Sequence, residues 1–133
     1  MDLKDRKDMN KFDLEERLID FAVLITDIDC LLPKTRAGAH FGGQLLRSGT
    51  SPALNYGEAQ SGESRKDFIH KIKVVLKELR ETLICLKIIH KIKIIENQDC
   101  IISAMKECNE LISIFVKSIE TAQKNIDYMK NKK

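Results

Sequence analysis

Residues 64–92, SRKDFIHKIKVVLKELRETLICLKIIHKI, decide the fold. Ser64 is followed three residues later by Asp67, a spacing typical of a helix N-terminus. The apolar side chains that follow share one side of a helical wheel: Phe68, Ile72, Val75, Leu76, Leu79, Leu83 and Leu86. The stretch therefore predicts a long amphipathic helix whose apolar side must be covered by other helices.

Two flanking segments carry the same spacing. Residues 12–32 predict a helix that Asp13 caps, with Glu16 as its reciprocal partner, and that Pro33 ends. Its apolar side is formed by Leu14, Leu18, Phe21, Ala22, Ile25, Ile28 and Leu32. Residues 100–128 predict a further helix. Its stripe is Ile101, Met105, Cys108, Leu111, Ile112, Phe115, Ile119, Ala122 and Ile126.

A fourth helix is predicted over residues 39–59, although its composition opposes one. Helix-breaking glycines stand at Gly42, Gly43, Gly49 and Gly57. Pro52 lacks a backbone donor and crowds the carbonyl of Ser48, so it either kinks this helix or restarts it. In a restart, Ser51 is the cap and Pro52 the first helical residue.

Four amphipathic helices with three short connections predict an all-α, antiparallel up-down-up-down four-helix bundle. The chain has 133 residues, which is the length of one domain, so residues 1–133 are expected to form a single unit. Residues 1–11 and 129–133 are strongly charged and are expected to be flexible. No strand pattern competes with this interpretation.

Composition narrows the functional classes. Aromatic residues make up 5% of the chain and Trp is absent, which argues against a base-stacking platform. The net charge of +3 does not by itself indicate a nucleic-acid partner. No apolar run reaches membrane-spanning length, and the N-terminus has no apolar segment of a secretory signal.

The four cysteines favour a cytoplasmic protein. None forms a CxxC pair, so free thiols are a better interpretation than a disulfide framework or a zinc site. Cys30 and Cys85 lie among apolar neighbours and are expected to be buried.

The residue 64–92 helix also carries a row of cations, at Lys66, Lys73, Lys77, Arg80, Lys87 and Lys91. At about 100° per residue they fall within a narrow arc that could follow a phosphate backbone. The alternative is an ordinary solvated face, which nearby Asp67, Glu78 and Glu81 favour. Ile84 and Ile88 lie beside the row, and exposed apolar residues there predict contact between subunits.

A second polar row is predicted on the helix before it, at Arg47, Ser51, Asn55 and Glu58. Spacings of four, four and three place these residues on one face. They form either a solvated face or a structural network of hydrogen bonds, buried or between subunits, in which Arg47 pairs with a carboxylate such as Glu78 or Glu81.

No catalytic, metal or cofactor site is predicted. None of the three histidines stands one helical turn from another, and no inward Glu-x-x-His pair is present. No nucleophile elbow or phosphate loop can be found. We therefore expect a protein that is not an enzyme. A pocket lined by Arg47, Asn55 and Glu58 together would argue otherwise.

The stretch from Gly43 to Leu86 resembles the 23S rRNA intervening-sequence protein family, bacterial four-helix-bundle proteins. The matching positions are Arg47, Ser51, Asn55, Glu58, Ala59, Ser64, Asp67, Phe68, Lys77, Glu78 and Glu81. The resemblance implies a homopentamer around a central channel, favours the structural network, and makes nucleic acid the suspected partner.

Two hypotheses follow. The first is a cytoplasmic, self-associating bundle that binds RNA or DNA through the basic row. The second is an oligomeric scaffold that binds another protein. Neither involves a membrane.

Overall fold

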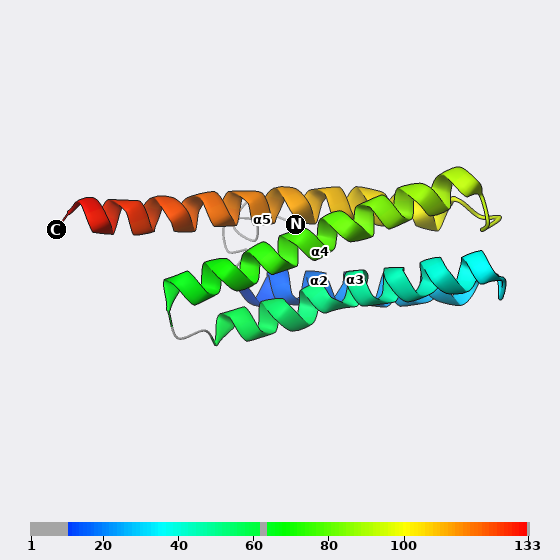
Figure 1. Ribbon diagram of the computed structural model, residues 1–133, viewed down its shortest axis with the longest axis horizontal. Helices are drawn as coiled ribbons and strands as arrows, with labels where there is room; N and C mark the ends of the chain where they lie inside the picture. The colour runs from blue at the N-terminus through cyan, green and yellow to red at the C-terminus, as the bar shows by residue number, and fades with distance from the viewer. Residues whose placement is uncertain (1–10, 62–63, 133) are drawn as a thin grey trace.

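The computed structural model describes residues 11–61 and 64–132. These residues form four α-helices and no strand: α2 (Lys11–Leu31), α3 (Arg36–Gln60), α4 (Arg65–Ile92) and α5 (Asp99–Asn131) (Figure 1). The fold is therefore all-α, as predicted. The flexibility expected for residues 1–11 falls almost entirely outside the described residues, as does Lys133, whereas residues 129–131 are helical.

Each helix packs against the next along the chain, and α2 touches α5 over a shorter region. The α2–α3 and α4–α5 connections lie at one end of the molecule and the α3–α4 connection at the other (Figure 1). This arrangement fits a four-helix bundle. The far end of α5 extends beyond the other helices (Figure 1), and no residue of α5 after Phe115 is buried. Within the described residues, no helix is long and apolar enough to cross a membrane.

The capping residues explain where the helices begin. Ser64 caps α4 as predicted, because its Oγ accepts a hydrogen bond from the backbone N–H of Asp67 at 3.1 Å. Thr35 caps α3 by accepting from Gly38 N at 3.1 Å, so α3 begins at Arg36, three residues before the predicted start. Asp13 is not a cap, because α2 already includes Lys11.

Pro52 lies inside α3, which runs from Arg36 to Gln60 as one helix. Of the two alternatives at this position, a kink or a restart, the restart is therefore wrong. Ser51 is an interior residue whose Oγ donates to the carbonyl oxygen of Arg47 at 2.6 Å, as helical serines do. Pro52 itself is buried, so packing of its ring offsets the missing backbone donor.

The glycines of α3 allow it to approach α2 closely. A Cβ placed on Gly49 would lie 2.8 Å from both Cγ1 and Cγ2 of Ile25, and one on Gly38 would overlap the backbone carbonyl of Pro33. Gly43 faces open space instead. Gly49, one of the predicted helix breakers, therefore serves the packing of α3 on α2, whereas Gly38, which was not among them, serves the connection before α3.

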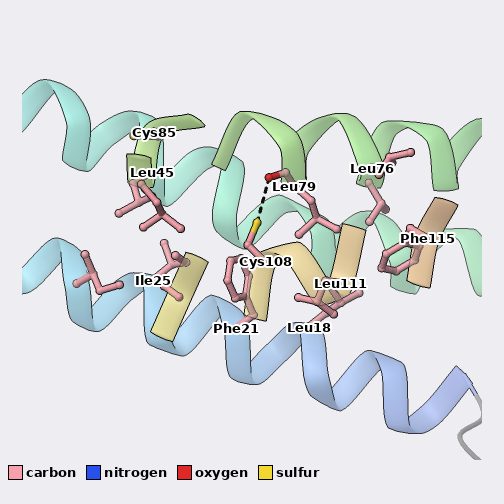
Figure 2. Close-up of a cluster of buried hydrophobic side chains, with 14 of the residues drawn as sticks. Leu18, Phe21, Ile25, Leu45, Leu76, Leu79, Cys85, Cys108, Leu111 and Phe115 are labelled. Carbon is pink, nitrogen blue, oxygen red and sulfur yellow. Dashed lines mark hydrogen bonds between the residues drawn. The ribbon is translucent and has the colours of Figure 1, made fainter. Parts of the chain in front are cut away.

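The core lies between the helices where the predicted stripes meet (Figure 2). Phe21 and Ile25 from α2 lie near Leu79 from α4 and Leu111 from α5 in this cluster. At its other end the Tyr56 and Phe115 rings pack edge to face with centroids 5.6 Å apart. The predicted residues that are buried are Leu18, Phe21, Ile25, Ile28, Leu32, Ile72, Val75, Leu76, Leu79, Leu86, Ile101, Cys108, Leu111 and Phe115.

The four cysteines are free thiols, but Cys30 is exposed, so the prediction that it is buried is wrong. Cys85 and Cys108 are buried, and burial raises their thiol pKa values to about 11 and about 12. The Cys108 thiol donates to the carbonyl oxygen of Leu79 at 3.1 Å, which links α5 to α4 (Figure 2). Both thiols therefore behave as apolar core groups.

Candidate nucleic-acid interface

The predicted basic row lies along the exposed face of α4. All six cations are exposed, and none of them belongs to an ion pair recorded within residues 11–61 and 64–132: Lys66, Lys73, Lys77, Arg80, Lys87 and Lys91. Their positive charges are therefore not neutralised by direct partners. A surface of this kind attracts a polyanion.

Two of the three α4 carboxylates that were expected to weaken this field, Glu78 and Glu81, contact α3, whereas Asp67 is exposed. Glu81 forms an ion pair with Arg47, with 3.0 Å between Oε2 and the guanidinium nitrogen. The Asn55 amide Nδ2 donates a hydrogen bond to Glu78 Oε1 at 2.8 Å. Burial raises the pKa of Glu78, and the hydrogen bond from Asn55 opposes that rise. Both carboxylates therefore have partners on α3, on the side of α4 that meets that helix.

The predicted polar row on α3 joins α3 to α4. Besides the two contacts just described, Glu58 forms an ion pair with Lys71, with 2.6 Å between Oε2 and Nζ. Arg47 and Glu81 are 57% and 37% exposed in their side chains, so within one chain Arg47 pairs with a partly exposed carboxylate and not with a buried one. The network is an exposed seam, and its ion pairs contribute little free energy each.

A buried polar pair between the same helices was not predicted. The hydroxyls of Thr82 and Ser48 lie 2.9 Å apart, and both residues are buried. The Ser48 hydroxyl also donates to Gln44 O at 3.0 Å. The signal was present, because Thr82 stands three residues after Leu79 and four before Leu86 within an apolar stripe.

A second unpredicted contact joins α2 to α5. The Arg17 guanidinium donates two hydrogen bonds to Glu107, at 2.9 and 2.7 Å, and one to Glu110 at 2.5 Å. These contacts, the hydrogen bond with Glu107 above all, raise the pKa of Arg17 despite its partial burial. Residues 17 and 107 are far apart in the chain, so no local sequence spacing could have identified the contact between Arg17 and Glu107.

Apolar side chains interrupt the row toward the C-terminal half of α4. Ile84, Ile88 and Ile92 are 56%, 38% and 45% exposed. An open groove of about 950 Å³ lies beside them, over α3 and α4. Its lining includes His40, Gln44, Arg47, Lys77, Arg80, Ile84 and Ile88. This groove offers both positive charge and apolar surface.

The groove lacks two of the three residues whose joint pocket would have argued for an enzyme. Arg47 lines the groove but Asn55 and Glu58 do not, so the pocket that would have indicated an enzyme is not formed there. Within the residues that the structure describes, no group of three or more His, Cys, Asp or Glu side chains could hold a metal ion.

Comparisons with known proteins identify one family. The family model described as 23S rRNA-intervening sequence protein matches residues 10–117. Among solved structures, the chain is similar to a protein of unknown function from the S23 ribosomal protein family of Bacteroides thetaiotaomicron VPI-5482. The two share 29% identity with a TM-score of 0.74, over 80% of this chain and 97% of that chain. No curated protein matches the chain.

Proposed function

This chain belongs to the 23S rRNA-intervening sequence protein family, and we propose from that premise that it is a non-catalytic, cytoplasmic RNA-binding protein. The observation that carries the proposal is the row of six exposed cations on α4 without ion-pair partners among the described residues. The family name refers to ribosomal RNA, which makes RNA a better candidate than DNA.

Binding through this row would depend on charge more than on base identity. Aromatic residues are few, so stacking contributes little, and Lys side chains contact phosphates as point charges. The affinity should therefore fall steeply as salt rises from about 50 to about 200 mM.

The test is fluorescence anisotropy with a labelled RNA hairpin that has single-stranded ends. The variant Lys77→Gln/Arg80→Gln/Lys87→Gln should bind roughly tenfold more weakly at low salt, and its log–log salt slope should be smaller by about 2. The matched control is Lys106→Gln/Lys117→Gln/Lys124→Gln, which removes the same charge from exposed positions on α5. Equal binding by the two variants, or no binding by the unmodified protein, would refute the proposal.

We also propose that the chain assembles as a homo-oligomer of up-down-up-down bundles, a pentamer by family resemblance. The supporting observation is the exposed apolar edge formed by Ile84, Ile88 and Ile92 on α4. Without RNA binding, an assembly of this kind would be a scaffold for another protein, which is the second candidate function.

Sedimentation velocity tests the assembly. Ile84→Glu should shift the protein to a smaller species, whereas Leu54→Glu, at a 71% exposed leucine on α3 outside the groove, should not. A protein that is already monomeric would rule out both the oligomer and the scaffold.

A further inference from the structure

A separate cleft lies where the first turns of α4 meet the last turns of α5. It has a volume of about 470 Å³. Arg65, Lys66 and Lys73 line it from α4, and Lys130 lines it from α5. Two residues of this cleft, Arg65 and Lys130, belong to neither of the predicted rows. The cleft is thus a concave extension of the basic face that the sequence alone did not indicate.

The cleft carries excess positive charge. No carboxylate lines it, and none of its four cations belongs to an ion pair recorded within the described residues. The nearest acids in sequence are exposed: Asp67 on α4, and Asp127, which accepts a hydrogen bond from Gln123 at 3.2 Å. Four like charges around one hollow repel each other, and a bound anion relieves that repulsion.

Phosphate fits this set of donors better than a carboxylate does. Arg65 can present two parallel N–H groups to a phosphate, and the lysines can contact its remaining oxygens as point charges. A phosphate monoester carries up to two negative charges, whereas a carboxylate carries one. The cation count therefore favours the monoester.

Besides the four cations, His70 and Gln123 line the cleft, and the rest of its lining is apolar. Ile69, which is 6% exposed, and the half-buried Ile126 line the cleft, and a smaller hollow next to it adds Met129. Apolar surface beside a phosphate site suits a group that is flat and poorly hydrated, such as a nucleoside.

We propose that this cleft binds a phosphate monoester attached to a nucleoside. Two sources share that chemistry: a free mononucleotide and the 5′-phosphorylated end of an RNA strand. The RNA end as ligand rests on the proposed RNA-binding function, because Lys66 and Lys73 also belong to the basic row. The free mononucleotide as ligand does not rest on that function.

Isothermal titration calorimetry with AMP, adenosine and inorganic phosphate tests the site directly. AMP should bind, and adenosine should not bind measurably. Lys66→Gln/Lys130→Gln should weaken AMP roughly tenfold or more, because it removes two charge-assisted contacts. Lys106→Gln/Lys117→Gln, two exposed lysines of α5 outside the cleft, should change it less than about twofold. Equal binding of AMP and adenosine, or an unaffected double variant with a normal melting temperature, overturns the proposal.

A pair of RNA strands distinguishes the two sources. If the cleft takes a strand end, a 5′-phosphorylated RNA binds more tightly than the same RNA with a 5′-hydroxyl, and Lys66→Gln/Lys130→Gln removes the difference. If AMP binds but the two RNAs do not differ, the ligand is the free mononucleotide.

The proposed function and this inference can fail separately. Lys77→Gln/Arg80→Gln/Lys87→Gln leaves the cleft lining unchanged, so this variant should bind AMP normally while binding RNA more weakly. If the protein binds AMP but no RNA, the proposed RNA-binding function is refuted and the proposal that the cleft binds a nucleotide phosphate is supported. If the protein binds RNA but not AMP, only the proposal that the cleft binds a nucleotide phosphate is refuted.

Discussion

Gly49→Ala should destabilise the protein, and Gly43→Ala should stabilise it. Both glycines lie inside α3, so both substitutions gain about 1 kcal/mol of helix propensity. At Gly43 nothing lies within 4 Å of the new methyl group. At Gly49 the methyl group would lie 2.8 Å from two carbons of Ile25 and 3.2 Å from its Cβ. Because that Cβ is fixed to the backbone, the side chain cannot simply rotate away.

The magnitude follows from the difference between the two sites. Helix propensity cancels in the comparison, which leaves the overpacking cost of about 1–3 kcal/mol at Gly49. Chemical denaturation followed by circular dichroism, at one fixed protein concentration, measures it. We expect Gly43→Ala to raise the free energy of unfolding by up to about 1 kcal/mol. The free energy of unfolding of Gly49→Ala should lie about 1–3 kcal/mol below that of Gly43→Ala.

A double-mutant cycle identifies Ile25 as the cause. Ile25→Ala alone should cost about 2–5 kcal/mol, because it leaves a cavity in the core. Adding Gly49→Ala to it should be neutral or stabilising, because the new methyl group then enters that cavity. Gly49→Ala stabilising the unmodified protein as much as Gly43→Ala does would show that α2 and α3 are not in close contact here.

The remaining predictions concern single side chains. Thr82→Val should lower stability by roughly 1–2 kcal/mol, because the buried hydroxyl pair is lost; Thr26→Val, at an exposed threonine, is the control in the same denaturation assay. Glu78→Gln should stabilise the protein at pH 7, and the gain should shrink as the pH falls through the raised native pKa of Glu78 to the ordinary glutamate pKa, below which it no longer changes. The sign follows because a carboxyl with a raised native pKa favours folding only while protonated; a gain independent of pH would contradict it. Iodoacetamide should modify Cys30 well before Cys108, whose pKa is raised to about 12, as peptide mass spectrometry would show; similar rates would mean that the core opens readily.

Periodicity predicted the helices well because burial follows it directly. Of the seven positions in the α4 stripe, five are buried, such as Ile72 and Leu79, and the other two, Phe68 and Leu83, pack against the core. Composition misled at Gly49, since a residue that weakens an isolated helix is required where two helices approach closely. The Cys30 error has a similar origin, because apolar neighbours in sequence need not be neighbours in space.

The candidate sites were harder to predict because they depend on which helices lie together. The α4 cations follow from spacing along one helix. By contrast, the pairing of Arg17 with Glu107 and the meeting of Lys66 with Lys130 join positions far apart in the chain. Burial of Arg47 could not be judged from its neighbours, and it proved to be exposed.

The extension of α5 beyond its last buried residue, Phe115, has a thermodynamic consequence. About sixteen residues of helix follow it, and because only the first of them, such as Val116 and Ile119, pack against the core, we expect the later turns to be the least stable part of α5. Ile126 and Lys130, which complete the cleft on the α5 side, lie in this segment. We therefore expect a ligand there to spend part of its binding free energy on ordering these turns, and its measured affinity to rise with any change that stiffens this part of α5.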